Sequence, residues 1–177
     1  MSNTVNVNRT CDSDQWWTPP HILEGVRAFF AEALGGDPRI PLDPATDERN
    51  PTGAETFYSS IGEEEPWWDG TFVNPPYGKD IKKFTAKIKE EAGSGALIVA
   101  LLPATRGEQK YWQEEVYNDR LSSLCLVRKR LHFLKPDGEE RGSAPFASTL
   151  FFYNAYWADV SKSFKDIGKC VEIGKVI

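Results

Sequence analysis

The chain has 177 residues, of which 40% are hydrophobic and 27% are charged, and this composition is typical of a globular protein with one domain. Its apolar runs fall short of the roughly 18 residues that a membrane helix needs, so no membrane span is expected. The formal net charge of −5 argues against a protein that binds nucleic acid through its overall charge, but it is compatible with a local basic patch on an acidic body.

The polar N-terminus, residues 1–13, is predicted to be flexible, and it lacks the apolar stretch of a signal peptide. Residues 14–177 are expected to form a single domain. The three cysteines, Cys11, Cys125 and Cys170, are odd in number and far apart, which fits neither a disulfide framework nor a zinc site. They favour a reducing, cytoplasmic setting.

The spacing of apolar residues predicts the secondary structure. Thr18 and Pro19 open a helix that runs to Leu34, where Gly35 and Gly36 end it. Further helices are predicted over residues 79–92 and 107–117, and a weak helical pattern begins at residue 160. Strands are predicted over residues 40–43, 71–73, 96–102, 121–127, 131–134 and 149–153. Loops are predicted over residues 44–69 and 136–143.

This alternation of strands and helices predicts an α/β domain with a mostly parallel sheet. The run over residues 96–102 is apolar throughout, as expected for a parallel strand that is covered on both faces. In such sheets ligands collect beyond the carboxyl ends of the strands. Three loops, at residues 43–44, 74–77 and 103–106, are therefore expected to meet at one edge of the sheet.

The tetrapeptide Asn74-Pro75-Pro76-Tyr77 ends one of the predicted strands. Two consecutive prolines have a fixed φ and no N–H donors, and they keep the preceding Asn74 out of the helical region. The resulting stiff backbone suits a site that holds an amide oxygen, a carbonyl and an aromatic ring in fixed relation. The alternative interpretation is a strand that ends in a proline-rich turn.

The tetrapeptide resembles the catalytic motif of S-adenosylmethionine-dependent amino-methyltransferases, in which Asp, Asn or Ser precedes two prolines and an aromatic residue. The wider pattern resembles the small phage-encoded DNA N6-adenine methyltransferases. The matching segments, in the family's order, are residues 14–19, 42–45, 72–78, 101–104, 130–133 and 144–148.

The resemblance implies a Rossmann-like methyltransferase fold with a mostly parallel sheet, an antiparallel strand near the C-terminus and no large target-recognition domain. It implies S-adenosylmethionine as the cofactor and double-stranded DNA, with adenine as the target, as the partner. It also implies that the protein is encoded by a phage or prophage and acts in the cytoplasm of a bacterial host cell. The residues that it places at the cofactor are Trp17, Thr18, Pro19, Asp43, Pro44, Ala45 and Asn74.

One segment departs from the pattern of larger methyltransferases. They have a glycine-rich loop after the first strand, where this chain has Ala45-Thr46-Asp47. The acidic partner of the cofactor's ribose is also left open, with Glu55 and Asp69 as the two alternatives.

The exocyclic amine of adenine is a poor nucleophile because its lone pair is delocalised into the ring. An enzyme favours attack by this nitrogen when it accepts hydrogen bonds from both N–H groups. The expected acceptors are Asn74 Oδ1 and the carbonyl of Pro75, held by the rigid backbone that Pro76 continues. Tyr77 offers an aromatic face on which the base can stack.

A base inside a duplex must be rotated out to reach such a pocket. Phe146 is therefore expected near the tetrapeptide. Lys79 and Arg130 are further candidates for binding the DNA, and they belong to two basic runs, residues 79–89 and 128–135. The alternative for both runs is a solvated face, and for Phe146 it is core packing.

Two other functions remain open at this point. The same tetrapeptide suits a methyltransferase that acts on cytosine N4, RNA or a protein amide, because all of these present a conjugated NH₂ group. The missing glycine-rich loop favours a binding module that retains the fold without turnover.

Overall fold

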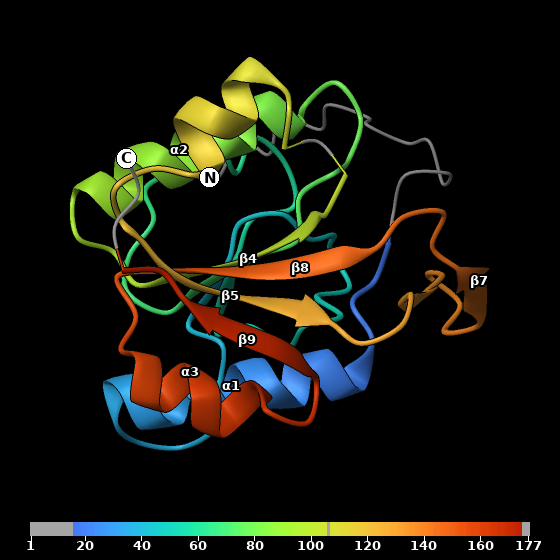
Figure 1. The fold of residues 1–177 in the computed structure, drawn as a ribbon. Coiled ribbons are helices and arrows are strands. Elements are labelled where there is room, and N and C mark those ends of the chain that lie inside the picture. The colour runs from blue at the N-terminus through green and yellow to red at the C-terminus, as the bar shows by residue number, and fades with distance from the viewer. Residues whose placement is uncertain (1–15, 106, 175–177) are drawn as a thin grey trace, which may run out of the picture.

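The computed structural model describes residues 16–105 and 107–174, so the predicted flexible segment, residues 1–13, lies outside the described residues. Its centre is a seven-stranded sheet with the order β2-β1-β3-β4-β8-β5-β9 (Figure 1). The strands are β1 (Leu42–Asp43), β2 (Thr56–Phe57), β3 (Thr71–Val73), β4 (Ile98–Pro103), β5 (Leu121–Val127), β8 (Ser148–Tyr153) and β9 (Gly168–Glu172).

The direction of the strands follows from their pairing. Strands β2, β1, β3 and β4 are parallel neighbours, whereas β8 is antiparallel to both β4 and β5, and β9 is antiparallel to β5. Strand β5 therefore runs in the same direction as β4. The predicted α/β class with a mostly parallel sheet is confirmed, and within the described residues two antiparallel strands near the C-terminus replace the single one that was expected.

Helices cover both faces of the sheet (Figure 1). Helices α1 (Pro20–Leu34) and α3 (Trp157–Phe164) pack on one face, and α2 (Ile81–Gly93) and the π-helix η1 (Trp112–Val116) pack on the other. Side chains alternate along a strand, so the consecutive residues Phe151 and Phe152 of β8 enter the two opposite cores. The ring of Phe152 meets Phe29 of α1 at 5.5 Å, and that of Phe151 meets Trp112 of η1 at 6.1 Å.

A second, two-stranded sheet consists of β6 (His132–Leu134) and β7 (Glu140–Ser143), which form a hairpin beside the main sheet. The hairpin is tied to the start of the described chain, because Trp17 and Leu134 exchange two backbone hydrogen bonds of 3.0 Å. This contact holds the hairpin next to the residues that enter α1.

Most predicted elements are confirmed, and three predictions were wrong. The helix predicted over residues 107–117 is the shorter η1, in which the Tyr117 N–H bonds to the Trp112 carbonyl five residues earlier. The loop predicted over residues 136–143 contains β7, whose polar residues show no apolar alternation. The loop predicted over residues 44–69 contains β2, which is two residues long and too short to produce a pattern.

Candidate active site

The tetrapeptide Asn74–Tyr77 directly follows β3, whose three residues are buried in the sheet. Strand β3 pairs in parallel with β1, which ends at Asp43. Because parallel neighbours end at the same edge, the tetrapeptide and the loop after β1 lie side by side at the carboxyl edge of the sheet.

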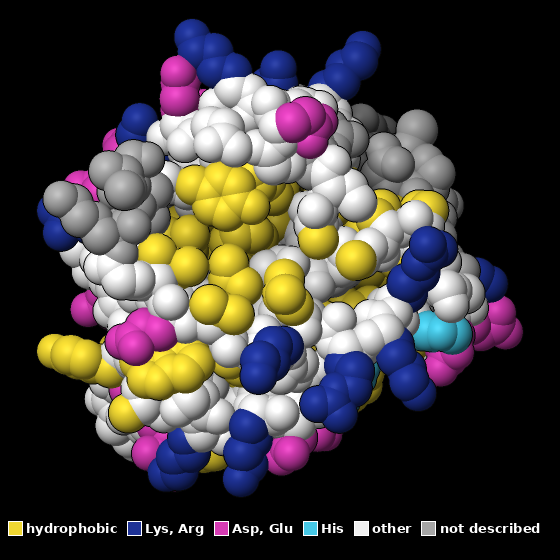
Figure 2. Space-filling view, viewed as in Figure 1, with side chains coloured by type: hydrophobic (Ala, Val, Ile, Leu, Met, Phe, Trp, Pro, Cys, Tyr) yellow, Lys and Arg dark blue, Asp and Glu magenta, His cyan; other side chains and the backbone are white. Residues whose placement is uncertain are grey.

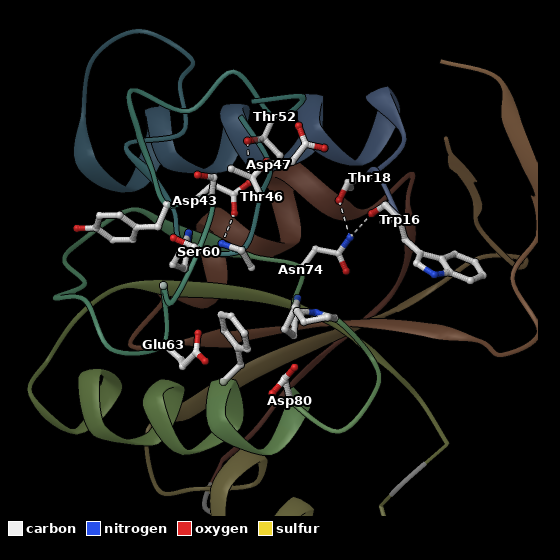
Figure 3. A pocket seen from close by; sticks show the side chains of 18 of the residues that line it. Trp16, Thr18, Asp43, Thr46, Asp47, Thr52, Ser60, Glu63, Asn74 and Asp80 are labelled. Atoms are coloured by element: carbon white, nitrogen blue, oxygen red, sulfur yellow. Dashed lines mark hydrogen bonds between the residues drawn. The ribbon is translucent and has the colours of Figure 1, made fainter. Parts of the chain in front are cut away.

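The side-chain amide of Asn74 has one defined orientation. Its Nδ2 donates hydrogen bonds to the Trp16 carbonyl at 2.9 Å and to Thr18 Oγ1 at 3.1 Å (Figure 3). A carbonyl can only accept, so the nitrogen must face Trp16 and Oδ1 must face away from it. Oδ1 accepts a hydrogen bond from the Tyr77 hydroxyl at 2.8 Å, which leaves its second lone pair for another donor.

Tyr77 connects the tetrapeptide to the core and to the hairpin. Its hydroxyl also lies 3.3 Å from the Leu101 carbonyl of β4, and burial of this hydroxyl raises the pKa of Tyr77 far above its usual value. The group therefore stays protonated and acts as a donor. The half-buried ring meets Phe146 edge to face at 5.1 Å and Phe133 of β6 at 6.3 Å.

A cavity of about 410 Å³ opens at this edge of the sheet (Figure 3). The residues that line it are 16–18, 43–47, 51–52, 58–63 and 74–77, together with Asp80 and Phe84. Its volume lies within the usual range for small-molecule and cofactor sites. Figure 3 shows Asp43, Thr46 and Asp47 on the side of α1, and Glu63 and Asp80 on the side of α2.

Asp43 is a buried carboxyl at the end of β1, with an exposed fraction of 2%. Its Oδ1 accepts from the Ala45 N–H at 3.0 Å, and its Oδ2 accepts from Thr52 Oγ1 at 2.7 Å. Burial raises the pKa of Asp43 to about 6, although the two hydrogen bonds act in the opposite direction. A positively charged ligand beside this carboxyl would recover part of the free energy lost by its desolvation.

The chemistry of the lining suits the cofactor that the resemblance implies. Within the described residues the lining has four acidic side chains, Asp43, Asp47, Glu63 and Asp80, and it has no lysine, arginine or histidine. Such a lining favours a ligand with a positively charged sulfur and an ammonium group. Thr46 Oγ1 is buried without a hydrogen-bond partner in the described part of the chain, so this hydroxyl is available to a ligand.

Two tryptophans, Trp16 and Trp17, lie just before the start of α1 and line the cavity. Trp17 Nε1 donates to Asp47 Oδ2 at 2.8 Å, and the Arg49 guanidinium lies 5.0 Å from the Trp17 ring. Hydrogen bonds from Arg49 and Trp17 keep the pKa of Asp47 below its usual value, even though partial burial acts to raise it. Asp47 is thus a carboxylate that already has partners on one side of the cavity.

The wall over residues 58–63 was not predicted from the sequence. It is held by Trp67, whose Nε1 donates to the Gly62 carbonyl at 2.8 Å, and by Lys83, whose Nζ lies 3.2 Å from Glu63 Oε1. Gly62 packs so closely on the loop after β1 that an added Cβ would lie 1.8 Å from the Pro44 carbonyl oxygen. The signal in the sequence was this single glycine in a polar loop, which is too common to identify a cavity wall.

Several predicted residues lie outside the cavity lining. Pro19 is the residue before α1, and Lys79 and Arg130 are exposed. Phe146 contacts the ring of Tyr77 and does not line the cavity.

The two residues considered for the ribose also lie elsewhere. Glu55 pairs with Arg39 at 3.4 Å, and Asp69 accepts from the Leu97 N–H at 2.8 Å. The third predicted loop contributes no described residue to the lining, and its Arg106 lies outside the described residues.

Two further findings concern the described residues as a whole. In residues 16–105 and 107–174, no group of three or more His, Cys, Asp or Glu side chains could hold a metal ion. Within the same ranges, no helix has the length and apolar character that crossing a membrane requires.

The chain matches no curated protein and no solved structure. The model of one protein family, described as DNA N-6-adenine-methyltransferase (Dam), matches residues 4–176. Methyltransferases of this family use S-adenosylmethionine as the methyl donor and methylate adenine in DNA at N6. The chain therefore belongs to the DNA N-6-adenine-methyltransferase (Dam) family and is an adenine-specific DNA methyltransferase.

Proposed function

We propose that the tetrapeptide Asn74–Tyr77 receives an adenine that has been rotated out of a DNA duplex, and that the adjoining cavity holds S-adenosylmethionine. The proposal includes the Rossmann-like methyltransferase fold, which the strand order and the site at the carboxyl edge support. It also includes a single domain over residues 14–177 without a large target-recognition domain. The predicted cytoplasmic location in a bacterial host and the phage origin stay predictions.

The orientation of the Asn74 amide is the observation that carries this proposal. With Nδ2 fixed by Trp16 and Thr18, the free lone pair of Oδ1 is available to one N–H of the adenine amine. The Pro75 carbonyl receives no hydrogen bond from the described part of the chain, so it is available to the second N–H. Two acceptors on one stiff segment draw the amine nitrogen toward a tetrahedral geometry, which makes its lone pair more nucleophilic.

The base is held by aromatic side chains in this proposal. Tyr77 and Phe146 meet at 5.1 Å and stand next to the two acceptors, and they give a flipped base an apolar surface. Asn74 has no basic group, and Tyr77 keeps its proton because burial raises its pKa. The proton of the methylated amine therefore leaves to water.

The cofactor is assigned to the cavity because its lining is acidic and aromatic. S-adenosylmethionine supplies a methyl group made electrophilic by its positively charged sulfur. Asp43, at the end of β1, supplies negative charge to this ligand, and Thr46 Oγ1 supplies the unused hydroxyl. Trp17, Thr18, Pro44 and Ala45 complete the lining near Asn74, while Pro19 acts through the start of α1.

The proposal is tested with the Asn74→Ala variant. Methyl transfer to unmethylated duplex DNA should be abolished, while calorimetry should find cofactor affinity within a few-fold of the wild type. Once the methylated site has been mapped, 2-aminopurine at the target position should become fluorescent on binding, because the base leaves the stack. Full activity of the variant would remove the role of Asn74, and unchanged 2-aminopurine fluorescence would exclude base rotation.

A further inference from the structure

The cavity lining sets a limit on where the DNA backbone can lie. Four carboxyl groups and no lysine, arginine or histidine within the described residues line the cavity, and the cations next to it, Arg49 and Lys83, are already paired with Asp47 and with Glu63 and Asp80, so the lining offers no free cation to a phosphate group. A duplex whose adenine reaches Tyr77 must therefore find cations outside the cavity. The sequence offers two basic runs for this purpose, the lysines of α2 and the segment after β5.

The lysines of α2 are largely engaged within the protein. Lys83 lies 3.2 Å from Glu63, and Lys87 lies 2.7 Å from Glu91. Lys82 sits over the ring of Tyr111 at 5.1 Å. Lys82 and Lys89 remain exposed without an ion pair among the described residues, so two of the four lysines of α2 are compensated by acidic partners.

The segment Arg128-Lys129-Arg130 is different. All three residues are exposed, and none of them forms an ion pair or a side-chain hydrogen bond within the described part of the chain. Lys129 has a φ of +66°, a left-handed conformation that is uncommon for a residue with a side chain. The Arg128 N–H bonds to the Ile167 carbonyl at 3.0 Å, which fixes the start of this turn at the end of β5.

Figure 2 shows Lys and Arg side chains gathered on one flank of this face, close to a histidine. Lys169 of β9 adds to the local charge, because it pairs in register with Leu126, two residues before Arg128, and has no ion pair among the described residues. Of the acidic residues in the neighbouring hairpin, Glu139 pairs with Lys135 at 3.1 Å, and Glu140 Oε2 lies 3.2 Å from His132 Nδ1.

The topology places this basic turn on the same edge as the tetrapeptide. Strands β3 and β5 run in the same direction and are separated by β4 and β8, so their carboxyl ends are three strand spacings, about 14 Å, apart across the sheet, and the register places the end of β5 three residues, about 10 Å, farther along the strands. The resulting separation of about 17 Å spans about five nucleotides along one DNA strand. The hairpin that follows the turn brings Phe133 to within 6.3 Å of the Tyr77 ring and so connects the turn to the site.

We propose that the turn Arg128–Arg130 binds the phosphate backbone of duplex DNA a few nucleotides away from the adenine at Tyr77. This inference rests on the proposed function, because it assumes that the rotated adenine binds beside Tyr77. The turn supplies affinity and register without reading bases, since contacts to phosphates carry no sequence information directly. Lys79, exposed beside the tetrapeptide, would then face the backbone next to the target nucleotide.

The test compares two charge-matched triple variants. In the first, Arg128, Lys129 and Arg130 are replaced by glutamine; in the control, the exposed residues Lys82, Lys89 and Lys110 are replaced by glutamine. Binding to a dye-labelled unmethylated duplex is measured by fluorescence anisotropy between about 50 and 200 mM salt. Each phosphate contact that is lost should reduce the slope of log K against log salt by about 0.9.

The first variant should lose up to about 2.7 of this slope and bind roughly tenfold to a hundredfold more weakly at about 0.15 M salt. The control should keep the wild-type slope. Equal slopes in both variants and the wild type, or equal losses in both variants, would overturn the proposal. If the first variant does not fold, as judged by its melting curve, Arg130→Gln and the charge-preserving Arg130→Lys replace it, and only the former should lose slope.

Two readouts separate this inference from the proposed function. Cofactor affinity, measured by calorimetry without DNA, should be the same in the wild type and the first variant. Absence of methyl transfer by the wild-type protein would count against the proposed function. Normal transfer by the wild type, together with an unchanged salt slope in the first variant, would count only against the role of the turn.

Discussion

The substitution Asn74→Asp tests the orientation of the amide with the smallest change in shape. It replaces Nδ2 by an oxygen at the position where the Trp16 carbonyl oxygen is 2.9 Å away. Thr18 can turn its hydroxyl and donate to the new carboxylate, but the Trp16 carbonyl cannot. The half-buried Trp16 carbonyl thereby loses this donor and faces a negative charge, at a cost of about 2–4 kcal/mol.

The carboxylate escapes this repulsion by turning away from the orientation that the amide holds, so regaining that orientation for reaction costs the same free energy and lowers the rate of methyl transfer at neutral pH about 30-fold to 1000-fold. Single-turnover transfer of labelled methyl to unmethylated duplex DNA measures the loss. The loss should shrink as the pH falls, because a protonated carboxyl can donate to the Trp16 carbonyl in place of the amide. Wild-type transfer at neutral pH by Asn74→Asp would refute the argument from amide orientation, and a loss that does not change with pH would refute the assigned cause.

Asp43→Asn should stabilise the protein at pH 8, because the pKa of Asp43 is raised to about 6 from 3.8 and ionising the buried carboxyl costs about 3 kcal/mol. The stabilising contribution of the protonated carboxyl is complete below pH 3.8 and is lost as the pH rises through 6. The melting temperatures of the variant and the wild type should therefore converge near pH 4 and differ at pH 8. Calorimetry at pH 8 should find that the variant binds the cofactor more weakly than the wild type. Thr18→Val should lower the transfer rate about fivefold by removing the acceptor at 3.1 Å, and Thr18→Ser should restore it. Tyr77→Phe should lower kcat by a similar factor because Asn74 Oδ1 loses its donor at 2.8 Å, whereas the KM for DNA should stay unchanged because the ring remains. Phe146→Ala should raise the KM for DNA several-fold without changing cofactor affinity, since its contact at 5.1 Å is with Tyr77 and not with the cavity.

The predictable part of the fold is the part with strong periodicity. The run over residues 96–102 is apolar at every position, and β4 is buried at every position because helices cover both faces of the sheet. The two-residue strand β2 offers no period, and it forms because the Tyr58 N–H reaches the Asp43 carbonyl at 3.0 Å after a long excursion of the chain. Elements that depend on such distant contacts leave no local pattern.

The same distinction applies to the site. The tetrapeptide is a local feature, since two prolines stiffen it whatever surrounds them. The hydrogen bonds from Asn74 to Trp16 and Thr18 cross more than fifty positions of the chain, and no spacing in the sequence indicates them. For this reason the sequence did not indicate which acidic residues line the cavity: Asp47 lines it and contacts Trp17, whereas Glu55 and Asp69 lie outside the lining and are engaged elsewhere.

The basic runs show why charge in a sequence is ambiguous. The lysines of α2 and the residues after β5 are both basic runs in the sequence, and only the folded chain shows that Lys83 and Lys87 have acidic partners. Arg128 and Arg130 have none within the described residues. A net charge of −5 therefore coexists with a local cluster of exposed, unpaired positive charge within the described residues.

The most direct test of the account is to incubate the wild-type protein with methyl-labelled S-adenosylmethionine and unmethylated duplex DNA, and then to digest the DNA to nucleosides. The account predicts that the label elutes with N6-methyldeoxyadenosine, and that Asn74→Ala gives none. Label in N4-methyldeoxycytidine, or no label in DNA from a protein that binds the cofactor, would contradict it.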